Sequence, residues 1–292
     1  MAKGLAIVNG YGVLPGIENF LLRMTEEFKK LGVQLDHKKT TDVLAFVQND
    51  GMIHSPLDAY DFILFLDKDM YLSELLEKLG YRLFNSAESI RLCDDKMLTH
   101  ITLSQNGVPM PKTIATPLNY LGLSSPEFIE NVEKELSYPI IGKSCFGSMG
   151  NSTYLLRKRE NLARFLERNI QAPTLLQEQI TSSYGFDYRF IVIGGKFVAA
   201  MERRNDSDFR SNLAQGGHGR PLSPKQSFID LAEKAAKLMG CDYCGVDLLA
   251  DNKGEPILCE VNSNAFIAGI EKTTGINVAE IYAKYILETI GK

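Results

Sequence analysis

The strongest constraint on the fold is a change of sequence pattern about 90 residues into the 292-residue chain. Before it, short apolar runs alternate with stretches in which apolar residues recur every three or four positions, the spacing of an amphipathic helix. After it, apolar runs follow one another across glycine-containing turns, the pattern of antiparallel hairpins. The chain is therefore expected to combine a parallel α/β unit with α+β lobes.

Apolar runs and helical spacing locate the expected elements. The runs expected to form strands are GLAIVNG (4–10), VQLDHK (33–38), DFILFLD (61–67), YRLFNS (81–86), YPIIGK (138–143), TLLQEQI (174–180), a hairpin over 188–204, and YCGVDLLA (243–250). The segments with helical spacing are 17–31, 127–136, 228–239 and 278–286. The glycines of NGYGVLPG (9–16) miss the G-x-G-x-x-G spacing, which favours a tight strand-to-helix turn over a dinucleotide site. NGVPMPKT (106–113) is expected to connect two lobes.

Composition narrows the functional classes. The net charge of −4 gives no basic field for nucleic-acid binding, and no apolar run approaches the roughly 20 residues that span a bilayer. The first residues do not read as a signal peptide, and five cysteines, an odd number, indicate reduced thiols; both favour a cytoplasmic location. Cys241 and Cys244 form one C-x-x-C without a second pair or matching histidines, which favours core residues over a zinc or redox site.

Three polar residues interrupt apolar strand patterns near the C-terminus. In LCEVNSNAF (258–266), Glu260 and Asn262 are two residues apart and so face the same side of a strand. If this strand forms a hairpin with the preceding GVDLL, Asp247 can come opposite Glu260. Three oxygen ligands on one surface suit Mg²⁺, and acids within apolar strands are costly unless something neutralises them. The alternative is two surface acids and a capping asparagine.

Two other segments carry groups that suit nucleotide binding. Lys143 ends an apolar strand and is followed by Gly147 and Gly150, which would let backbone N–H groups approach phosphate oxygens. A hairpin turn would have the same pattern. Glu178 lies between apolar neighbours in LLQEQI, where a strand can face an adenine edge and a carboxylate can hold a ribose hydroxyl. An ordinary strand without a ligand would show the same sequence pattern.

An arginine-rich span lies between residues 189 and 220 of a chain that is acidic overall. Guanidinium groups make planar, two-pronged contacts to carboxylates and phosphates. The span therefore predicts an anion-binding surface, with scattered exposed arginines as the alternative. Its members are Arg189, Arg203, Arg204, Arg210 and Arg220.

Taken together and in this order, these segments resemble the ATP-grasp ligases, specifically the RimK-type branch, which includes an alpha-L-glutamate ligase. The matching stretches are SIRLCDDKMLTHITLSQNGVPMPKT, PIIGKSCFGSMGN, LLQEQI, GFDYRFIVIGGKFVAAMERR, DFRSNLAQGG, GVDLL and EVNSNAFIAGIEKTTGINVAE. The resemblance implies a small N-terminal parallel α/β domain over 1–88 before a two-lobed ATP-grasp fold. The implied central lobe covers 89–178, and the C-terminal lobe with the metal site covers 179–292.

The resemblance also implies an activity and assigns roles to residues. ATP activates a carboxylate as an acyl phosphate, an amine attacks it to form an amide, and the glycine loop closes as a lid that excludes water. The implied cofactors are ATP and Mg²⁺ or Mn²⁺, with two ions. The residues implied to contact the nucleotide are Lys96, Lys143, Gly147, Gly150, Gln177, Glu178, Ile180 and Asp187. Those implied to bind the ions are Asp247, Glu260 and Asn262, and those facing the reacting phosphoryl group are Arg203, Arg210 and Asn212.

One motif departs from the family pattern. Relatives of the glutamate-ligase type read E-V-N-x-S-P-G, whereas this chain has Ala265 and Phe266 in place of Pro-Gly. That loop lies beside the acceptor in the family, so the departure weakens the assignment of glutamate as the added amino acid. An aromatic residue there is closer to the branch that acts on an amino-group carrier protein in lysine or arginine synthesis.

The expected function is ATP-dependent ligation of an amino acid, of the glutamate type, to a carboxylate-bearing peptide, protein or small acid, without nucleic acid or membrane. A homo-oligomer is left open. One alternative is the carrier-protein ligase, and another is a non-catalytic ATP-binding regulatory or scaffold protein. A metal-dependent phosphotransferase is disfavoured because no Asp or His stands out as a base for a hydroxyl acceptor.

Overall fold

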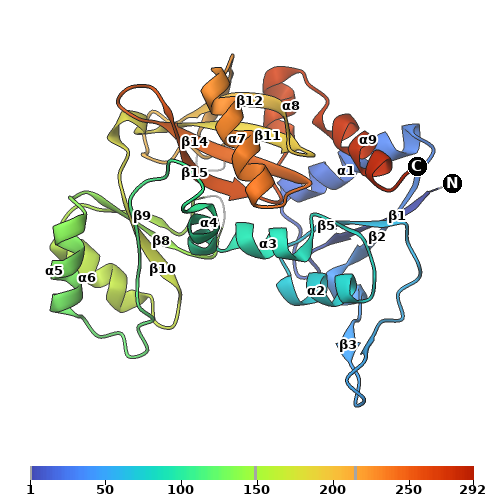
Figure 1. Cartoon of the computed structure of the whole chain (residues 1–292), viewed down its shortest axis with the longest axis horizontal. Helices are drawn as coiled ribbons and strands as arrows, with labels where there is room; N and C mark the ends of the chain where they lie inside the picture. Colours follow the sequence, from blue (N-terminus) through green and yellow to red (C-terminus); the bar gives the residue numbers. More distant parts are fainter. Residues whose placement is uncertain (1, 148–149, 214–215) are drawn as a thin grey trace.

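The computed structural model describes residues 2–147, 150–213 and 216–292 (Figure 1). Its helices are α1 (Pro15–Lys30), η1 (Thr40–Asp42), α2 (Met70–Lys78), α3 (Ala87–Asp94), α4 (Lys96–Leu103), α5 (Pro126–Glu135), α6 (Arg159–Arg168), η2 (Thr181–Ser183), α7 (Gln226–Leu238), α8 (Ala268–Thr274) and α9 (Val278–Thr289). Its strands are β1 (Lys3–Val8), β2 (Gln34–Lys39), β3 (Phe46–Val47), β4 (Ile53–His54), β5 (Phe62–Leu66), β6 (Leu83–Phe84), β7 (Thr113–Ala115), β8 (Ile140–Ser144), β9 (Thr153–Leu156), β10 (Thr174–Glu178), β11 (Phe186–Ile193), β12 (Lys196–Arg204), β13 (His218–Pro221), β14 (Tyr243–Ala250) and β15 (Pro256–Asn262).

The N-terminal sheet has the order β2-β1-β5-β6, and its neighbouring strands are parallel. β5 is buried at every position because both faces of the sheet are covered. Its alternate residues enter two different cores. Phe62, Leu64 and Leu66 share one core with residues of α1 and α9, whereas Ile63 and Phe65 share another with residues of α2. The predicted parallel α/β unit is thus confirmed.

Two antiparallel sheets form the rest of the molecule. The central sheet, β7-β10-β8-β9, packs against α5 and α6, and Figure 1 shows this unit at one end of the molecule. The C-terminal sheet, β13-β12-β11-β14-β15, is covered on both faces. Along β11, Phe190 and Val192 pack in one core with α7, while Ile191 and Ile193 pack in the other with α8 and α9.

The last two strands of this sheet pair as the sequence predicts. β14 and β15 form a hairpin in which Asp247 lies opposite Glu260, with an irregularity immediately after this pair. Val261 is fully buried, and Glu260 and Asn262, on either side of it along the strand, are partly exposed. The hairpin therefore places two carboxylates and an amide close to one another on the sheet.

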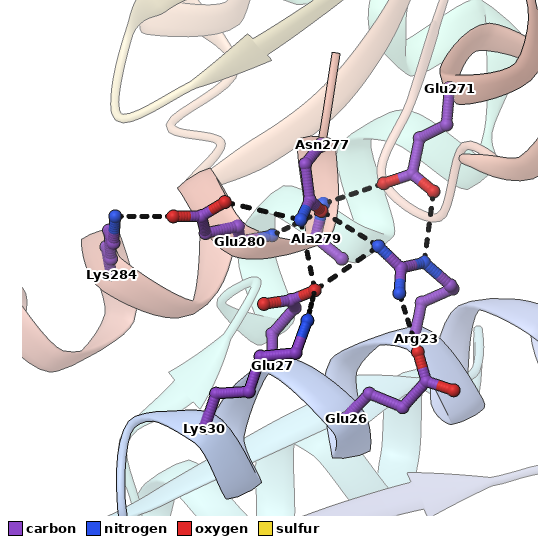
Figure 2. A network of polar contacts seen from close by, with 9 residues as sticks. All are labelled: Arg23, Glu26, Glu27, Lys30, Glu271, Asn277, Ala279, Glu280 and Lys284. Carbon is purple, nitrogen blue, oxygen red and sulfur yellow. Dashed lines mark hydrogen bonds and ion pairs between the residues drawn. The ribbon is translucent and has the colours of Figure 1, made fainter. Parts of the chain in front are cut away.

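The two ends of the chain share one hydrophobic core. Phe20 of α1 and Tyr282 of α9 lie in the same core, with ring centroids 6.3 Å apart. A polar network borders this core (Figure 2). Arg23 of α1 donates to Glu271 of α8 (3.2 Å) and to Asn277 at the start of α9 (2.9 Å), and Asn277 donates back to Glu27 of α1 (3.0 Å). These contacts fix α1 against α8 and α9.

A buried asparagine connects the N-terminal sheet to the C-terminal lobe. Asn85, 2% exposed, donates to the carbonyl oxygens of Tyr243 (2.8 Å) and Ser263 (2.9 Å) and accepts from the N–H of Tyr243 (2.9 Å).

Because backbone groups left unpaired in a core are costly, Asn85→Ala is expected to lower the free energy of unfolding by about 3 kcal/mol in urea denaturation. The control is Asn106→Ala, which removes two hydrogen bonds at an exposed position and should change stability by less than about 0.5 kcal/mol. Equal effects of the two substitutions would contradict the bridging role of Asn85.

Three cysteines lie together in the core around α7. Cys241 and Cys244 are buried and free, which confirms them as core residues; Cys93 joins them, with its sulfur 3.6 Å from that of Cys241. Among the described residues, no helix is both long and apolar enough to cross a membrane.

Candidate active site

The predicted site residues line two neighbouring cavities. The first cavity lies between the central and C-terminal sheets. From the predicted set it is lined by Lys96, Lys143, Gly147, Gly150, Gln177, Glu178, Ile180, Asp187, Arg210, Asn212, Asp247 and Glu260. The second cavity is lined by Arg203 and Asn262, and by Asn212 and Glu260 again. The fold therefore gathers every predicted site residue at this pair of cavities, although the role of each residue stays a prediction.

Lys143 is held in the first cavity by a buried glutamine. Its ammonium donates to the Gln177 side-chain oxygen (2.8 Å), and the Gln177 amide nitrogen donates to Thr113 (2.8 Å) and lies 3.0 Å from Nε2 of His100. Gln177 is 2% exposed, so its buried side chain holds the Lys143 ammonium from the protein side of the cavity. The contact with the Gln177 amide fits a neutral His100 that accepts at Nε2.

His100 gives the fold a defined pH dependence. Burial, reinforced by the positive charge of Lys143, lowers the pKa of His100 to about 4 from an unfolded value near 6.5. Between these two values the unfolded chain binds the extra proton, so stability falls as the pH drops from 7 towards 4. We expect His100 to account for a loss of about 2 kcal/mol between pH 7 and pH 5. His100→Gln should remove this part of the pH dependence of unfolding, and an unchanged pH profile would contradict it.

A second lysine, Lys96, lies between Gly147 in the lining of the first cavity and Glu260 on β15. Asp95 caps α4 by accepting from the N–H groups of Met97 and Leu98, which fixes Lys96 in the first turn. The Lys96 ammonium donates to the carbonyl of Gly147 (2.8 Å) and lies 3.5 Å from a Glu260 oxygen. It is therefore placed where phosphate oxygens beside Glu260 would meet a positive charge.

The far side of the same loop contacts an arginine. Arg210 donates to the carbonyl of Gly150 (2.9 Å) and is held by the carboxylate of Asp208 (2.8 Å). A side chain at position 150 would come within 2.8 Å of Asn212, so glycine allows the loop to approach this segment. The lid predicted over 147–150 includes residues 148–149, which lie outside the described residues.

The floor of the site is a buried cluster of arginines and aspartates. Asp247 accepts from Arg189 through both oxygens (2.5 and 2.7 Å), and its Oδ2 lies 2.8 Å from Arg203. Arg203 also donates through two nitrogens to Asp187. Burial opposes the charged forms, but Arg189 and Arg203 hold the pKa of Asp247 below its usual value. Burial likewise acts to lower the pKa of Arg203, and Asp187 and Asp247 raise it above its usual value.

The donor set for a divalent cation fits at Glu260 and Asn262. Glu260 has a partly exposed carboxylate that meets only Lys96 in an ion pair of the described chain, and Asn262 offers an amide oxygen. Oxygen donors of this kind suit Mg²⁺. Asp247 lies opposite Glu260, yet both of its oxygens already accept from guanidinium groups. Its Oδ1 accepts from Arg189 alone among the described residues and keeps a second lone pair, so a cation bound there would lie beside the Arg189 guanidinium.

Sequence reasoning missed the pairing of Arg189 and the contribution of N-terminal residues to the site. Arg189 was part of the arginine-rich span, but its pairing with Asp247 follows from their alignment on β11 and β14. The turn around Gly12 and Gly16 was assigned to a strand-to-helix connection, and it also lines the second cavity. Asp67, at the end of β5, gave no signal beyond its place after an apolar run.

A family model described as the RimK-like ATP-grasp domain matches residues 93–286. The chain belongs to this family. It is an ADP-forming carboxylate–amine ligase of the ATP-grasp type, and ATP is its nucleotide.

Two curated relatives of this ATP-grasp ligase are synthases. It is 32% identical to beta-citrylglutamate synthase B of Danio rerio over 77% of this chain and 55% of that protein. It is 30% identical to N-acetylaspartylglutamate synthase A of Homo sapiens over 89% of this chain and 64% of that protein. The chain thus spans between half and two thirds of the length of these two relatives. The structure of the ATP-grasp ligase PsnB complexed with minimal precursor has a TM-score of 0.73, with 20% identity and 99% of both chains covered, which confirms the fold.

Proposed function

We propose that this ATP-grasp ligase activates a carboxylate as an acyl phosphate and transfers the acyl group to the amino group of an amino acid. One observation carries the proposal: the two cavities meet at Glu260 and Asn212, which line both. A nucleotide in the first cavity would therefore direct its terminal phosphate towards a carboxylate in the second. Phosphoryl transfer needs this alignment and neutralisation of charge more than a covalent group from the protein.

The charged residues around the junction support distinct roles. Lys96 and Lys143 would neutralise phosphate oxygens from the side of the central sheet, while Glu260 and Asn262 would hold Mg²⁺ from the opposite side. When bound, Mg²⁺ supplies neutralisation of the phosphate charge and a template for the transferring group. Arg203, with Arg210 and Asn212, would face the charge that develops on the transferring phosphoryl group. The second ion, with Asp247 as a ligand, belongs to the same proposal.

The substrate class follows from the relatives and from the second cavity. Both synthases are named for a product that contains glutamate, which supports an amino acid of the glutamate type as the added group. Phe266 lines the second cavity together with Ala265, so the loop that departs from the glutamate-ligase pattern would contact that substrate. The carboxylate partner would be a peptide, a protein or a small acid.

The remaining parts of the proposal concern organisation and location. The divisions at residues 88 and 178 are proposed as the domain boundaries. All five cysteines lie in the described chain and are free thiols, which supports a cytoplasmic location.

Stimulated ADP release tests the function. With Mg²⁺ and ATP present, a panel of amino acids is combined with a panel of carboxylic acids and peptides, and ADP and amide products are measured by coupled assay and mass spectrometry. Ligation requires at least one pair that raises ADP release and gives one amide per ADP. ATP binding without stimulation by any pair would favour the regulatory alternative, and phosphorylated product without an amide would favour a phosphotransferase.

A further inference from the structure

The second cavity is built by two parts of the chain that are distant in sequence. Its volume is about 470 Å³, enough for a small molecule or the end of a peptide. One wall consists of the carboxyl ends of β1 and β5 with the first turn of α1, and the opposite wall consists of the end of β15 and the start of α8. Ligands of open α/β sheets bind outside the carboxyl ends of the strands. The carboxyl-end edge of the N-terminal sheet, where ligands of such sheets bind, therefore faces the end of β15.

The basic groups of this cavity already have acidic partners. Arg189 and Arg203 are paired with Asp247, and the Lys68 ammonium donates to Asp94 (2.5 Å). A ligand anion would therefore compete with existing ion pairs at each of these three cations. The acidic side of the cavity is arranged differently.

Asp67 has a carboxylate oxygen that no described group satisfies. Its Oδ1 accepts from the N–H of Lys68 (2.6 Å), and its backbone carbonyl accepts from the Asn264 side chain (2.9 Å), which fixes the residue against the opposite wall. Its Oδ2 is buried and has no hydrogen-bond partner among the described residues. Burial raises the pKa of Asp67, because a carboxylate is disfavoured where water cannot reach it, while hydrogen bonds from the Lys68 N–H and the Asn9 side chain act to lower it. Among the described residues no lysine or arginine forms an ion pair with this carboxylate, so a cation on a ligand in the cavity would stabilise its charged form.

The surfaces beside Asp67 are apolar. Leu66 precedes it, and Val13, Leu14 and Phe266 line the same cavity. Phe266 lies so close to the first turn of α1 that a side-chain carbon at Gly16 would come within 2.3 Å of its ring. Asp67 thus lies beside the apolar part of the cavity lining, which suits a cationic head on an aliphatic stem.

We propose that the second cavity binds a substrate through its protonated amino group and that Asp67 holds this group. An ammonium ion matches Asp67 in charge and can donate to its carboxylate, whereas a neutral hydroxyl can donate but brings no charge. The inference rests on the proposed function, because it names the substrate class of that cavity. The ammonium can belong to the amino acid that is added or to an amino-bearing carboxylate that is activated, and the experiment separates these sources.

Binding to the complex with Mg²⁺ and ADP tests the proposal independently of turnover. The probes are glycine, L-alanine, L-leucine, L-lysine, L-glutamate and the dipeptide Ala-Glu, each as the free amine and as its N-acetyl derivative, in calorimetric titrations. The wild type is expected to bind at least one free amine about tenfold or more tightly than its acetylated form. Asp67→Asn and Asp67→Ser should each remove that preference. If every acetylated compound matches its free amine in the wild type, or if Asp67→Asn retains the preference, the proposal is overturned.

A matched control lies at the other end of the same strand. Asp61 immediately precedes β5, is exposed and accepts from the N–H of Lys3 (2.8 Å), so Asp61→Asn should leave the preference unchanged. Loss of the preference in this control as well would also overturn the proposal.

The amide product then assigns the source of the ammonium. If the compound held by Asp67 supplies the amide nitrogen, it is the added amine, and if it supplies the carbonyl, it is the activated acid. A wild type that shows the binding preference but forms no amide with any pair would contradict the proposed ligation and leave the role of Asp67 in binding intact.

Discussion

Replacing Glu260 with glutamine is expected to lower the rate of amide formation by about 10³-fold or more. Glutamine keeps the shape of the side chain but removes the charge that would hold Mg²⁺ at the junction of the two cavities. Loss of one preorganised electrostatic contact costs about 10²–10³-fold, and loss of a metal removes several kcal/mol of transition-state stabilisation. The measurement is kcat for product-coupled ADP release at saturating ATP, with ATP affinity determined separately.

The control is Glu255→Gln, because Glu255 is exposed on the turn that leads into the same strand. This variant should retain wild-type turnover within about twofold, as expected for a surface substitution. If Glu260→Gln keeps more than about a tenth of the wild-type rate, the carboxylate is not the metal ligand that the mechanism requires. A scaffold protein would show no turnover to lose and only weakened ATP binding.

The second large effect concerns stability. Arg203 is 3% exposed and lies between Asp187 and Asp247. Arg203→Met should lower the free energy of unfolding by about 3–5 kcal/mol at pH 7, because it leaves buried carboxylate charge without its partner. Urea denaturation followed by circular dichroism measures the change. Amide formation should fall as well, since Arg203 lines the second cavity and the proposed function assigns it to the transferring phosphoryl group.

The neighbouring Arg204 provides the comparison. Its side chain is 43% exposed and lies 3.3 Å from Asp206, so Arg204→Met should cost no more than about 1 kcal/mol. A similar loss of stability in both variants would show that the buried cluster is not what makes Arg203 important. Arg203→Lys should fall between the two, because an ammonium keeps the charge but cannot bind Asp187 with two parallel hydrogen bonds.

The parts of the fold that the sequence predicted depend on local pattern. Short apolar runs located the strands, and a short turn sufficed to bring Asp247 opposite Glu260. In the same way, the spacing of apolar residues over 17–31 predicted α1, and Gly32, with a φ of 72°, ends it. Each of these inferences needed only residues that are neighbours along the chain or across one hairpin.

The parts that could not be predicted depend on long-range packing. Gly16 and Phe266 lie 250 positions apart, and nothing in the local sequence predicts that they are in contact. Nor does the local sequence predict that Asp67 lines the same cavity as Glu260 and Asn262 of β15. The same holds for Asp247, whose acidity suggested a metal ligand, whereas in the fold two arginines occupy its oxygens. Charge and spacing suggested the candidate residues, and the assembled sheets determine which of them are already paired.

The packing of α1 against α9 has a consequence for synthesis of the protein. Phe20, Met24 and Phe28 are fully buried in a core to which Val278, Tyr282 and Ile286 also contribute. On the ribosome, the apolar face of α1 emerges early, yet its final partners emerge only with the last helix. We therefore expect nascent chains that end before α9 to expose this face, to recruit chaperones and to be sensitive to proteases. Protection should begin only when α9 has left the exit tunnel.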